Sequence, residues 1–179
     1  PWVILRMFVP KMHCDWRFIC KGSLFRVPFG GWGLRNNGDL EVKFTKEKGG
    51  WGTEKGSVRV LMEDSAKTID EGASIAVFPE GVRNPNPHGP LGEFKAGYFD
   101  LAVQKGYKIL PIAISGSETC WPVHDWKLDA AHVYLTAGEE LISPEGHTAE
   151  SLKELVWKKI TEMRETHPDR QALAAKGKK

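Results

Sequence analysis

The chain has 179 residues, of which 41% are hydrophobic and 27% are charged, and this size suits a single domain that buries its own core. Its 25 basic and 23 acidic side chains give a net charge of +2 and are mixed along the sequence, which argues against a nucleic-acid-binding protein. Three cysteines without Cys-x-x-Cys spacing argue against a disulfide framework and a zinc site, and they favour a reducing compartment.

The sequence contains no segment that predicts a membrane-spanning helix. No apolar run approaches the roughly 18 residues that such a helix needs, and no signal peptide with a charged start and an apolar middle opens the chain. Because the chain begins at Pro1 and not at methionine, we expect the natural protein to begin further upstream.

The first half of the chain predicts two strands and one helix. Apolar side chains alternate with others in the strands, and they recur at helical spacing in the helix. In chain order we expect a strand at 15–20 followed by Lys21, a tight turn in the glycine- and proline-rich segment 27–33, a strand at 40–44, a loop at 48–52, and a helix between an N-cap at Ser57 and a terminating Gly72.

The second half predicts three strands and two helices. In chain order we expect a strand at 74–78, a helix at 94–105 ended by Gly106, strands at 108–115 and 132–136, and an amphipathic helix with apolar positions from Leu152 to Met163. A strand, a helix and a strand in this order imply that 74–78 and 108–115 form a parallel pair with a right-handed crossover. We therefore predict the α/β class: a single domain with a mixed, largely parallel sheet flanked by helices.

The predicted boundary within the chain falls after residue 145. Residues 1–145 would form the main domain, and residues 146–179 a C-terminal amphipathic helix with a basic tail. Lys176, Lys178 and Lys179 make this tail basic, and we expect it to be frayed and able to reach anionic lipid.

An acid and two bases follow the strand predicted at 74–78. In open α/β sheets, ligands bind where strands end and loops begin, so Glu80 and Arg83 lie where a site is expected. The planar fork of Arg83 suits a phosphate, and Lys95 would add a point charge beside the positive end of the predicted helix. Glu80 can accept a hydrogen bond from a hydroxyl, and Gly81 lets the backbone approach closely. Each residue alone would be interpreted as a solvated surface group, but together they predict a site for an anion and a neighbouring hydroxyl.

Four short elements in a fixed order resemble the glycerolipid acyltransferase family, whose best-known members are the 1-acylglycerol-3-phosphate (lysophosphatidate) acyltransferases with their PlsC-type domain. The family's phosphate-site motif, Phe-Pro-Glu-Gly-Thr-Arg-Ser, is matched at 78–84, with Val82 for the threonine and Asn84 for the serine. The resemblance spans roughly residues 16–140. The other three elements are Lys-x-x-Leu-x-x-x-Pro-x-x-Gly, matched by Lys21, Leu24, Pro28 and Gly31; Phe-Lys-x-Gly, matched by Phe94, Lys95 and Gly97; and a proline-bearing strand, matched at 110–114.

The resemblance implies a glycerol-3-phosphate acyltransferase-like fold and a membrane enzyme of phospholipid biosynthesis. Such an enzyme moves a fatty acyl group from acyl-CoA or acyl-ACP to lysophosphatidic acid and makes phosphatidic acid. It requires no metal and no bound cofactor, because the thioester donor is a co-substrate. The implied partners are a lysophospholipid acceptor, an acyl thioester donor and a membrane surface. The implied location is the intracellular face of the endoplasmic reticulum, a plastid membrane or a bacterial inner membrane.

The resemblance also implies which residues bind the acceptor. Arg83 and Lys21 would bind its phosphate with Lys95 in support, and Glu80 would position its glycerol. The full set of implied substrate-binding residues is Lys21, Glu80, Gly81, Arg83, Lys95 and Gly97.

The family's catalytic element, Asn-His-x-x-x-x-Asp, is not matched in this chain. In the family it precedes the lysine strand, and its histidine is the general base that activates the acceptor hydroxyl. The residues before Lys21 contain only His13 and Asp15, with one residue between them. Residues 1–5 resemble the segment that comes directly after the aspartate in the family. We therefore expect the catalytic histidine and aspartate upstream of Pro1 and no catalytic residue within this chain.

A second histidine and aspartate have the family's spacing but the wrong place. His124 and Asp129 come after the proline-bearing strand, where the family element does not belong, so we interpret this match as a coincidence. It leaves open a hydrolase with Ser115 or Ser117 as nucleophile, although no Gly-x-Ser-x-Gly elbow frames either serine.

Two further alternatives remain at this level. One is a non-catalytic lipid- or phosphate-binding module of the same fold, and the other is an acyltransferase for a different lysophospholipid, which Val82 and Asn84 leave open. Phe44 also stands where a strand of the family ends in arginine, so Lys43 or Lys46 would have to supply that charge.

Aromatic side chains are candidates for contact with the membrane surface. Trp2, Phe8, Trp32 and Trp51 could belong to an interfacial patch, although tryptophans are also common core residues.

Overall fold

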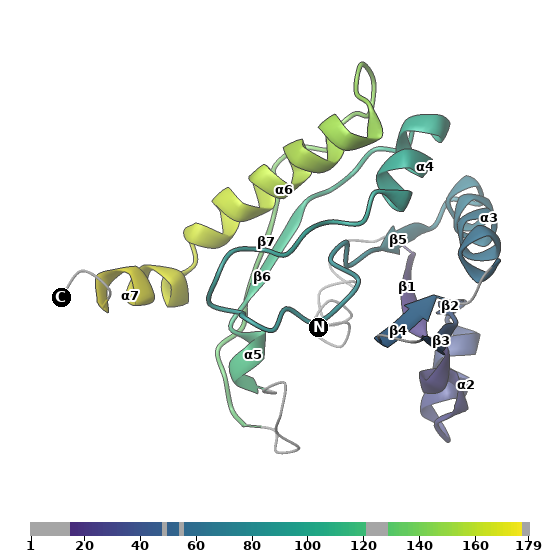
Figure 1. Cartoon of the computed structure of the whole chain (residues 1–179), viewed down its shortest axis with the longest axis horizontal. Helices are drawn as coiled ribbons and strands as arrows, with labels where there is room; N and C mark the ends of the chain where they lie inside the picture. The colour runs from purple at the N-terminus through teal and green to yellow at the C-terminus, as the bar shows by residue number, and fades with distance from the viewer. Residues whose placement is uncertain (1–14, 48–49, 54–55, 121–128, 177–179) are drawn as a thin grey trace. The chain divides into compact units, whose positions relative to one another are not determined.

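The structure is a computed structural model that describes residues 15–47, 50–53, 56–120 and 129–176. The chain divides into two compact units, one that ends at Val77 and one that begins at Phe78. Figure 1 labels the helices and strands of both units.

The first unit contains a parallel sheet and a separate hairpin. Its elements are β1 (Trp16–Lys21), the 3-10 helix η1 (Gly22–Arg26), α2 (Gly30–Asn36), β2 (Leu40–Val42), β3 (Phe44–Glu47), β4 (Gly50–Thr53), α3 (Ser57–Asp70) and β5 (Ser74–Ala76). The parallel sheet has the order β2-β1-β5, while β3 and β4 pair antiparallel. Phe18 of β1 is buried and pairs with Ala76 of β5, and Ile19 pairs with Leu40 of β2. The helix α3 contacts β2 and β5, between which it lies in the chain.

Two predictions for the hairpin region are wrong. The loop expected at 48–52 includes β4, because an antiparallel hairpin needs only a short connection after β3. The strand expected at 40–44 ends at Val42, and β3 begins at Phe44. Lys43 separates the two strands and belongs to neither of them. Its carbonyl accepts a hydrogen bond from the hydroxyl of Ser57 at 3.3 Å.

The segment predicted as a turn at 27–33 contains the start of α2. The reversal is confined to Pro28 and Phe29, where Phe29 has a φ of 60°. Gly31 is needed for a close approach, because a Cβ at this position would lie 2.1 Å from the carbonyl oxygen of Phe25 in η1. The glycine therefore lets α2 pack directly on η1.

The helix predicted after Ser57 is confirmed, with one correction at its start. Its N-cap is Gly56 and not Ser57, whose hydroxyl bonds elsewhere. The helix ends at Asp70, and Gly72 follows with a φ of 97°, as a terminating glycine should. The face formed by Leu61, Ser65 and Ala66 is buried.

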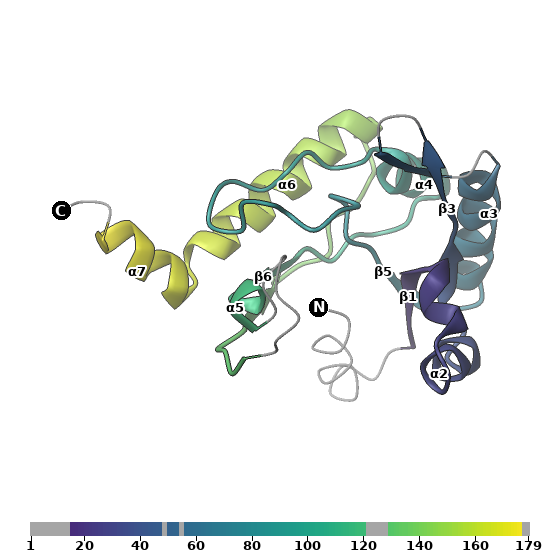
Figure 2. The ribbon, with the colours of Figure 1, turned by 60° about the horizontal axis from the view of Figure 1, so that its bottom comes forward.

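The second unit packs two helices around an aromatic core. Its elements are α4 (Gly97–Lys105), β6 (Ile112–Ser115), α5 (Ser117–Cys120), β7 (Tyr134–Ala137), α6 (Ala149–Glu165) and α7 (Pro168–Lys176). The strands β6 and β7 pair antiparallel, and α6 packs against α4 and β6 (Figure 1). Figure 2 shows the chain turned by 60°. The core consists of Phe94, Phe99, Ala102, Leu152 and Val156.

The predicted parallel pair between 74–78 and 108–115 joins a strand of the first unit to a strand of the second, and it stays a prediction. Among the described strands, β5 pairs with β1, and β6 pairs with β7. Both strands are also shorter than expected, because β5 ends at Ala76 and β6 begins at Ile112. The helix expected from residue 94 starts only at Gly97, and the amide of Lys95 before it donates to the carbonyl of Pro79 at 2.8 Å.

The predicted closing helix is confirmed as α6, which begins with a capping box formed by Thr148 and Ser151. The expected basic tail includes a further helix, α7, that extends to Lys176. The boundary proposed after residue 145 stays a prediction, although α6 packs on α4 within the second unit. The α/β class itself is confirmed, with a parallel three-stranded sheet and flanking helices.

Candidate functional site

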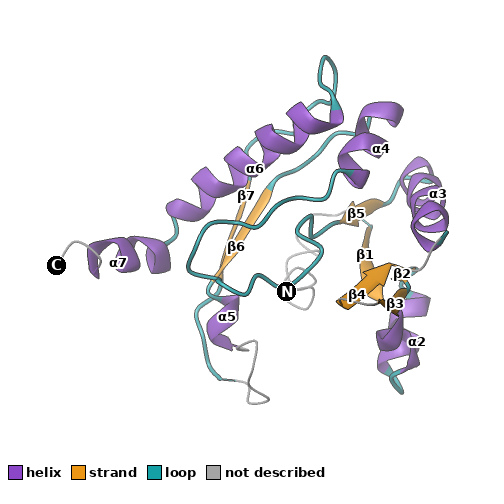
Figure 3. Ribbon diagram, viewed as in Figure 1, coloured by secondary structure: helices purple, strands orange, loops and turns teal. Residues whose placement is uncertain are grey.

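The candidate site lies in a long loop of the second unit, from residue 78 to the start of α4 (Figure 3). Glu80 is half-buried in this loop. Its Oε2 accepts hydrogen bonds from the backbone amide of Gly92 at 2.8 Å and from Nδ2 of Asn84 at 3.1 Å. Within the described residues no donor reaches Oε1. Two donors thus fix one carboxylate oxygen and leave the other available to a ligand.

Lys95 lies beside the turn that follows Glu80. Gly81 has a φ of 68°, in the left-handed region that favours glycine, and its amide donates to the carbonyl of Phe78 at 3.0 Å. A Cβ at Gly81 would lie 3.7 Å from Cγ and 3.9 Å from Cε of Lys95. The structure therefore brings Glu80, Gly81 and Lys95 together, as the sequence predicts.

The two remaining predicted residues of this unit lie on the same segment of chain. Arg83 is exposed in the loop, three residues after Glu80. Gly97 is the first residue of α4, whose first-turn amides and positive dipole end favour an anion. Lys95, an exposed lysine two residues before this helix end, suits a phosphate group.

Lys21 belongs to the other unit. It is the last residue of β1, which is the carboxyl end of the central parallel strand, and its side chain is exposed. Its predicted role in binding phosphate stays a prediction.

The sequence marks Asn84 only as a departure from the family motif, but its amide has a defined structural role. Nδ2 reaches both Oε2 of Glu80 and the carbonyl of Pro90, each at 3.1 Å, while Oδ1 accepts the amide of Asn86 at 2.9 Å. Asn84 therefore ties Glu80 to the loop that follows it. Nothing in the structure explains Val82, which is exposed.

The sequence did not reveal the residues that hold this loop from α6 and α7. Nε1 of Trp157 donates to the carbonyl of Gly92 at 3.2 Å. The guanidinium groups of Arg164 and Arg170 bond to carbonyls between residues 87 and 89. No local pattern could reveal them, because 65 to 83 residues separate the partners. A buried arginine in an amphipathic helix is recognisable only once the fold is known.

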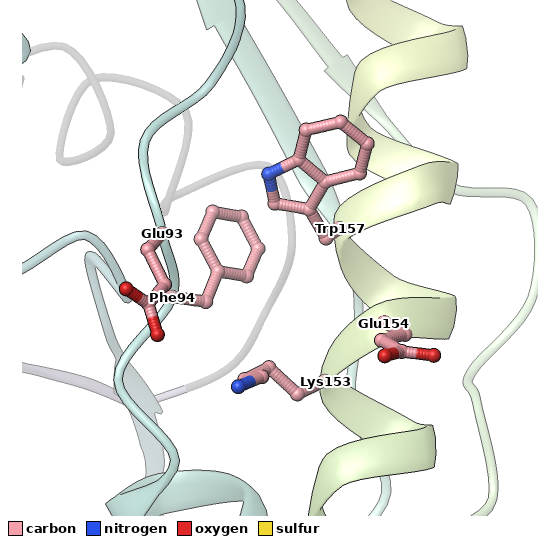
Figure 4. A pocket seen from close by; sticks show the side chains of 5 residues that line it. All are labelled: Glu93, Phe94, Lys153, Glu154 and Trp157. Atoms are coloured by element: carbon pink, nitrogen blue, oxygen red, sulfur yellow. The ribbon is translucent and has the colours of Figure 1, made fainter.

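A shallow hollow lies next to the loop, between its last residues and α6 (Figure 4). Its lining residues are Glu93, Phe94, Lys153, Glu154 and Trp157. None of the predicted substrate-binding residues lines it. Two residues that line the hollow, Glu93 and Phe94, precede Lys95 in the chain, but the hollow is not part of the candidate site.

A second polar cluster is buried where α7 meets β6 and β7. Nδ1 of His167 lies 2.7 Å from Oγ of Ser115, and Nε2 lies 2.7 Å from Oγ1 of Thr136. Ser115 donates to Oδ1 of Asp169 at 2.9 Å, so the hydrogen-bond network assigns the ring proton to Nδ1. Burial is the main cause that lowers the pKa of His167, with Arg164 acting in the same sense and Asp169 in the opposite one.

This cluster bears on the hydrolase alternative. Ser115 is only 2% exposed and His167 only 3%, so a substrate has no access to either side chain. His124 lies outside the described residues. The interactions of Ser115 are those of a buried structural group and not of an exposed nucleophile.

Several sequence expectations concern residues that the structure does not describe. Trp2, Phe8, His13 and Cys14 lie outside the described ranges, as does the side chain of Trp51. Within the described part of the chain, no group of side chains has the composition of a metal site, and no helix is long and apolar enough to cross a membrane.

The fold and this loop place the chain in a known family. A sequence model of the family described as Acyltransferase matches residues 2–115, and the chain belongs to this family. The chain is 30% identical over 108 residues to a chloroplastic 1-acyl-sn-glycerol-3-phosphate acyltransferase of Brassica napus, which covers 60% of this chain and 28% of the relative. It is 28% identical over 137 residues to the 1-acyl-sn-glycerol-3-phosphate acyltransferase of Pseudomonas aeruginosa. This match covers 76% of this chain and 49% of the relative.

A solved structure has the same fold. The crystal structure of PlsC, the 1-acyl-sn-glycerophosphate acyltransferase of Thermotoga maritima, matches with a TM-score of 0.68 and 24% identity. The match covers 84% of this chain and 56% of that protein. The chain thus spans half or less of the two curated relatives and slightly more than half of this structural neighbour.

Proposed function

We propose that the protein transfers a fatty acyl group from acyl-CoA or acyl-ACP to lysophosphatidic acid and so forms phosphatidic acid. The observation that carries this proposal is the fixed carboxylate of Glu80, followed in the chain by Gly81, whose backbone lies beside Lys95. Within the described part of the chain, Oε1 of Glu80 has no donor, so it can accept the hydroxyl of a glycerol, and neighbouring cations can bind the attached phosphate. The names of the relatives support the same reaction.

Each site residue then has a distinct role toward the acceptor. Arg83 binds the phosphate through its planar fork of donors, and Lys95 supports it as a point charge. Lys21 is assigned to the phosphate by its family motif. Glu80 binds the glycerol, while Gly81 and Gly97 allow the backbone and the start of α4 to come close.

The reaction itself is an acyl exchange. The acceptor hydroxyl oxygen forms an ester bond with the acyl carbon, the carbon–sulfur bond breaks, and the hydroxyl proton ends on the departing thiol. We assign the role of general base to a histidine upstream of Pro1, oriented by an aspartate, as the family element implies. No metal and no bound cofactor are required, because the thioester is already activated.

A membrane surface is the partner that the substrates require, and four exposed apolar side chains within nine consecutive residues of the first unit support it. We call this set, Leu24, Val27, Phe29 and Trp32, the apolar patch; Phe29 is 91% exposed and Trp32 is 70% exposed. Residues 21–38 carry three basic and no acidic side chains, and all three are exposed: Lys21, Arg26 and Arg35. Exposed aromatic groups among cations are typical of contact with an anionic membrane, here at its intracellular face.

The test is turnover by the protein extended upstream of Pro1. With lysophosphatidic acid and either thioester donor, we expect mass spectrometry to detect phosphatidic acid, whereas residues 1–179 alone should give none. Turnover by residues 1–179 would refute the upstream base. An extended protein that binds lysophosphatidic acid without turnover would instead be the non-catalytic module, and preference for another lysophospholipid would correct the acceptor.

A further inference from the structure

The loop between Glu80 and Gly92 cannot hold its own shape through backbone hydrogen bonds alone. It contains Pro85, Pro87 and Pro90, and proline has no backbone N–H to donate. Its carbonyl groups therefore need donors from elsewhere in the molecule.

Two buried arginines supply those donors. Arg164 at the end of α6 donates to the carbonyls of Pro87 and Gly89, the latter at 3.0 Å. Arg170 in α7 donates to the carbonyls of His88, at 2.6 Å, and Pro87. Each arginine is only 5% exposed. Four hydrogen bonds from two guanidinium groups thus converge on three consecutive residues.

The same loop ends at the donors that fix Glu80. The amide of Gly92 bonds to Oε2 of Glu80, and the carbonyl of Gly92 accepts from Trp157 on α6. Asn84 bridges Oε2 to the carbonyl of Pro90. The carboxylate of Glu80 is therefore bonded to residues at the two ends of the loop, Asn84 and Gly92. Arginines of α6 and α7 hold the middle of the same loop.

We propose that Arg164 and Arg170 are positioning residues that hold the loop from 84 to 92 and thereby fix the carboxylate of Glu80 for the acceptor. Neither arginine needs to touch the substrate. Their influence passes through the loop carbonyls to Gly92 and Asn84. For its activity readout, this inference rests on the proposed function.

The first experiment measures hydrogen exchange of the Gly92 amide in the full-length protein, which needs no activity. In Arg170→Met, with the clamp weakened, we expect exchange at Gly92 to accelerate at least tenfold, while amides of α4 and α6 stay protected. Lys159→Met, at an exposed position of α6, is the matched control and should leave Gly92 unchanged. Unchanged protection at Gly92 in Arg170→Met, or equal acceleration in the control, would overturn the proposal.

The second experiment is a double-mutant cycle in kcat/KM with Glu80→Gln. If Arg170 acts through Glu80, Arg170→Met in the wild-type background should lower kcat/KM about a hundredfold, which is the loss that a misplaced group in the site can cause. In the Glu80→Gln background, the same substitution should lower kcat/KM little further. Equal losses in both backgrounds would show a general structural effect and overturn the proposal.

Conservative variants keep the test valid if the methionine variant does not fold. Arg170→Lys and Arg164→Lys keep the charge, but one ammonium cannot replace a fork that spans two carbonyls. We expect intermediate exchange at Gly92 in both, and wild-type exchange in both would contradict the clamp. A wild-type protein without acyl transfer would refute the proposed function, and the exchange measurement would still decide the clamp.

Discussion

The backbone amide of Gly92 donates to Oε2 of Glu80 at 2.8 Å, and a Cβ added at residue 92 would lie 2.7 Å from that same oxygen. Such a distance is too short for a carbon and an oxygen that are not bonded. The close approach of backbone and carboxylate therefore depends on glycine at this position.

Gly92→Ala should consequently displace the carboxylate of Glu80. We expect kcat/KM for acyl transfer to fall about ten- to a hundredfold, because a small misplacement at a reacting group is costly. Steady-state kinetics of the full-length protein measure this. Gly33→Ala is the control, since a Cβ there meets nothing within 4 Å. Unchanged kcat/KM in Gly92→Ala would contradict the positioning of Glu80.

Two substitutions in α2 test which glycine the packing of α2 on η1 requires. Gly31 is required and Gly33 is not. In Gly31→Ala the new Cβ would lie 2.1 Å from the backbone oxygen of Phe25, so we expect a loss of about 1–3 kcal/mol in the free energy of unfolding. Gly33→Ala should raise it by about 0.4–1 kcal/mol, because alanine restricts the unfolded chain. Urea unfolding measures both, and equal effects would contradict the close packing of α2 on η1.

The sequence predicts the candidate site best where its residues are neighbours in the chain. Glu80, Gly81 and Arg83 lie within four consecutive residues, and Lys95 was placed beside them by its motif alone. The structure brings Lys95 beside Gly81, because the amide of Lys95 donates to the carbonyl of Pro79. The ends of helices and strands are predicted less accurately: α4 starts at Gly97 and not at residue 94, and no periodicity reveals the hydrogen bond from Lys95 to Pro79.

Long-range partners could not be predicted from the sequence. In the sequence, Arg164 and Arg170 look like ordinary solvent-facing arginines of a helix. In the structure, both are buried against a proline-rich loop. His167 is equally ordinary in sequence, and only the fold brings it to Ser115 and Thr136. The pairing of β5 with β1 likewise depends on tertiary structure and not on the order of elements.

The buried His167 predicts how stability depends on pH. Burial lowers its folded pKa below the ordinary value of about 6.5, despite the opposing effect of Asp169. Above that pH both states are neutral and the group has no effect. As pH falls below about 6.5, the unfolded chain binds a proton that the folded chain does not, so stability decreases until the folded pKa is reached.

Urea unfolding between pH 5 and 8 measures this dependence, which for one proton cannot exceed about 1.4 kcal/mol per pH unit. We expect His167→Gln to have a shallower slope below pH 6.5 than the wild type. The matched control is His147→Gln, at a histidine near the surface that hydrogen-bonds to Ser151. Equal slopes for wild type and His167→Gln would contradict the lowered pKa.

The apolar patch predicts selective binding to anionic vesicles. Phe29→Asn removes the most exposed aromatic ring, and asparagine tolerates the positive φ of this residue. Together with Trp32→Ser, it should weaken binding to vesicles that contain phosphatidylglycerol by about tenfold or more, because two apolar groups that the bilayer would bury are lost. Flotation measures binding. Leu141→Ser, an exposed leucine outside the patch, is the control, and an equal loss there would contradict the assignment.

The most direct test of the acceptor site is the Michaelis constant for the acceptor in full-length Arg83→Ala. Charge-assisted hydrogen bonds contribute about 1.5–3 kcal/mol, so we expect KM for lysophosphatidic acid to rise about ten- to a hundredfold while KM for the acyl donor is unchanged. Arg59→Ala, at an exposed arginine of α3 paired with Glu63, should change neither value. With monoacylglycerol, which lacks the phosphate, the effect of Arg83→Ala should disappear. An equal rise in KM for acceptor and donor, or the same loss with monoacylglycerol, would contradict the assignment of this loop to the acceptor phosphate.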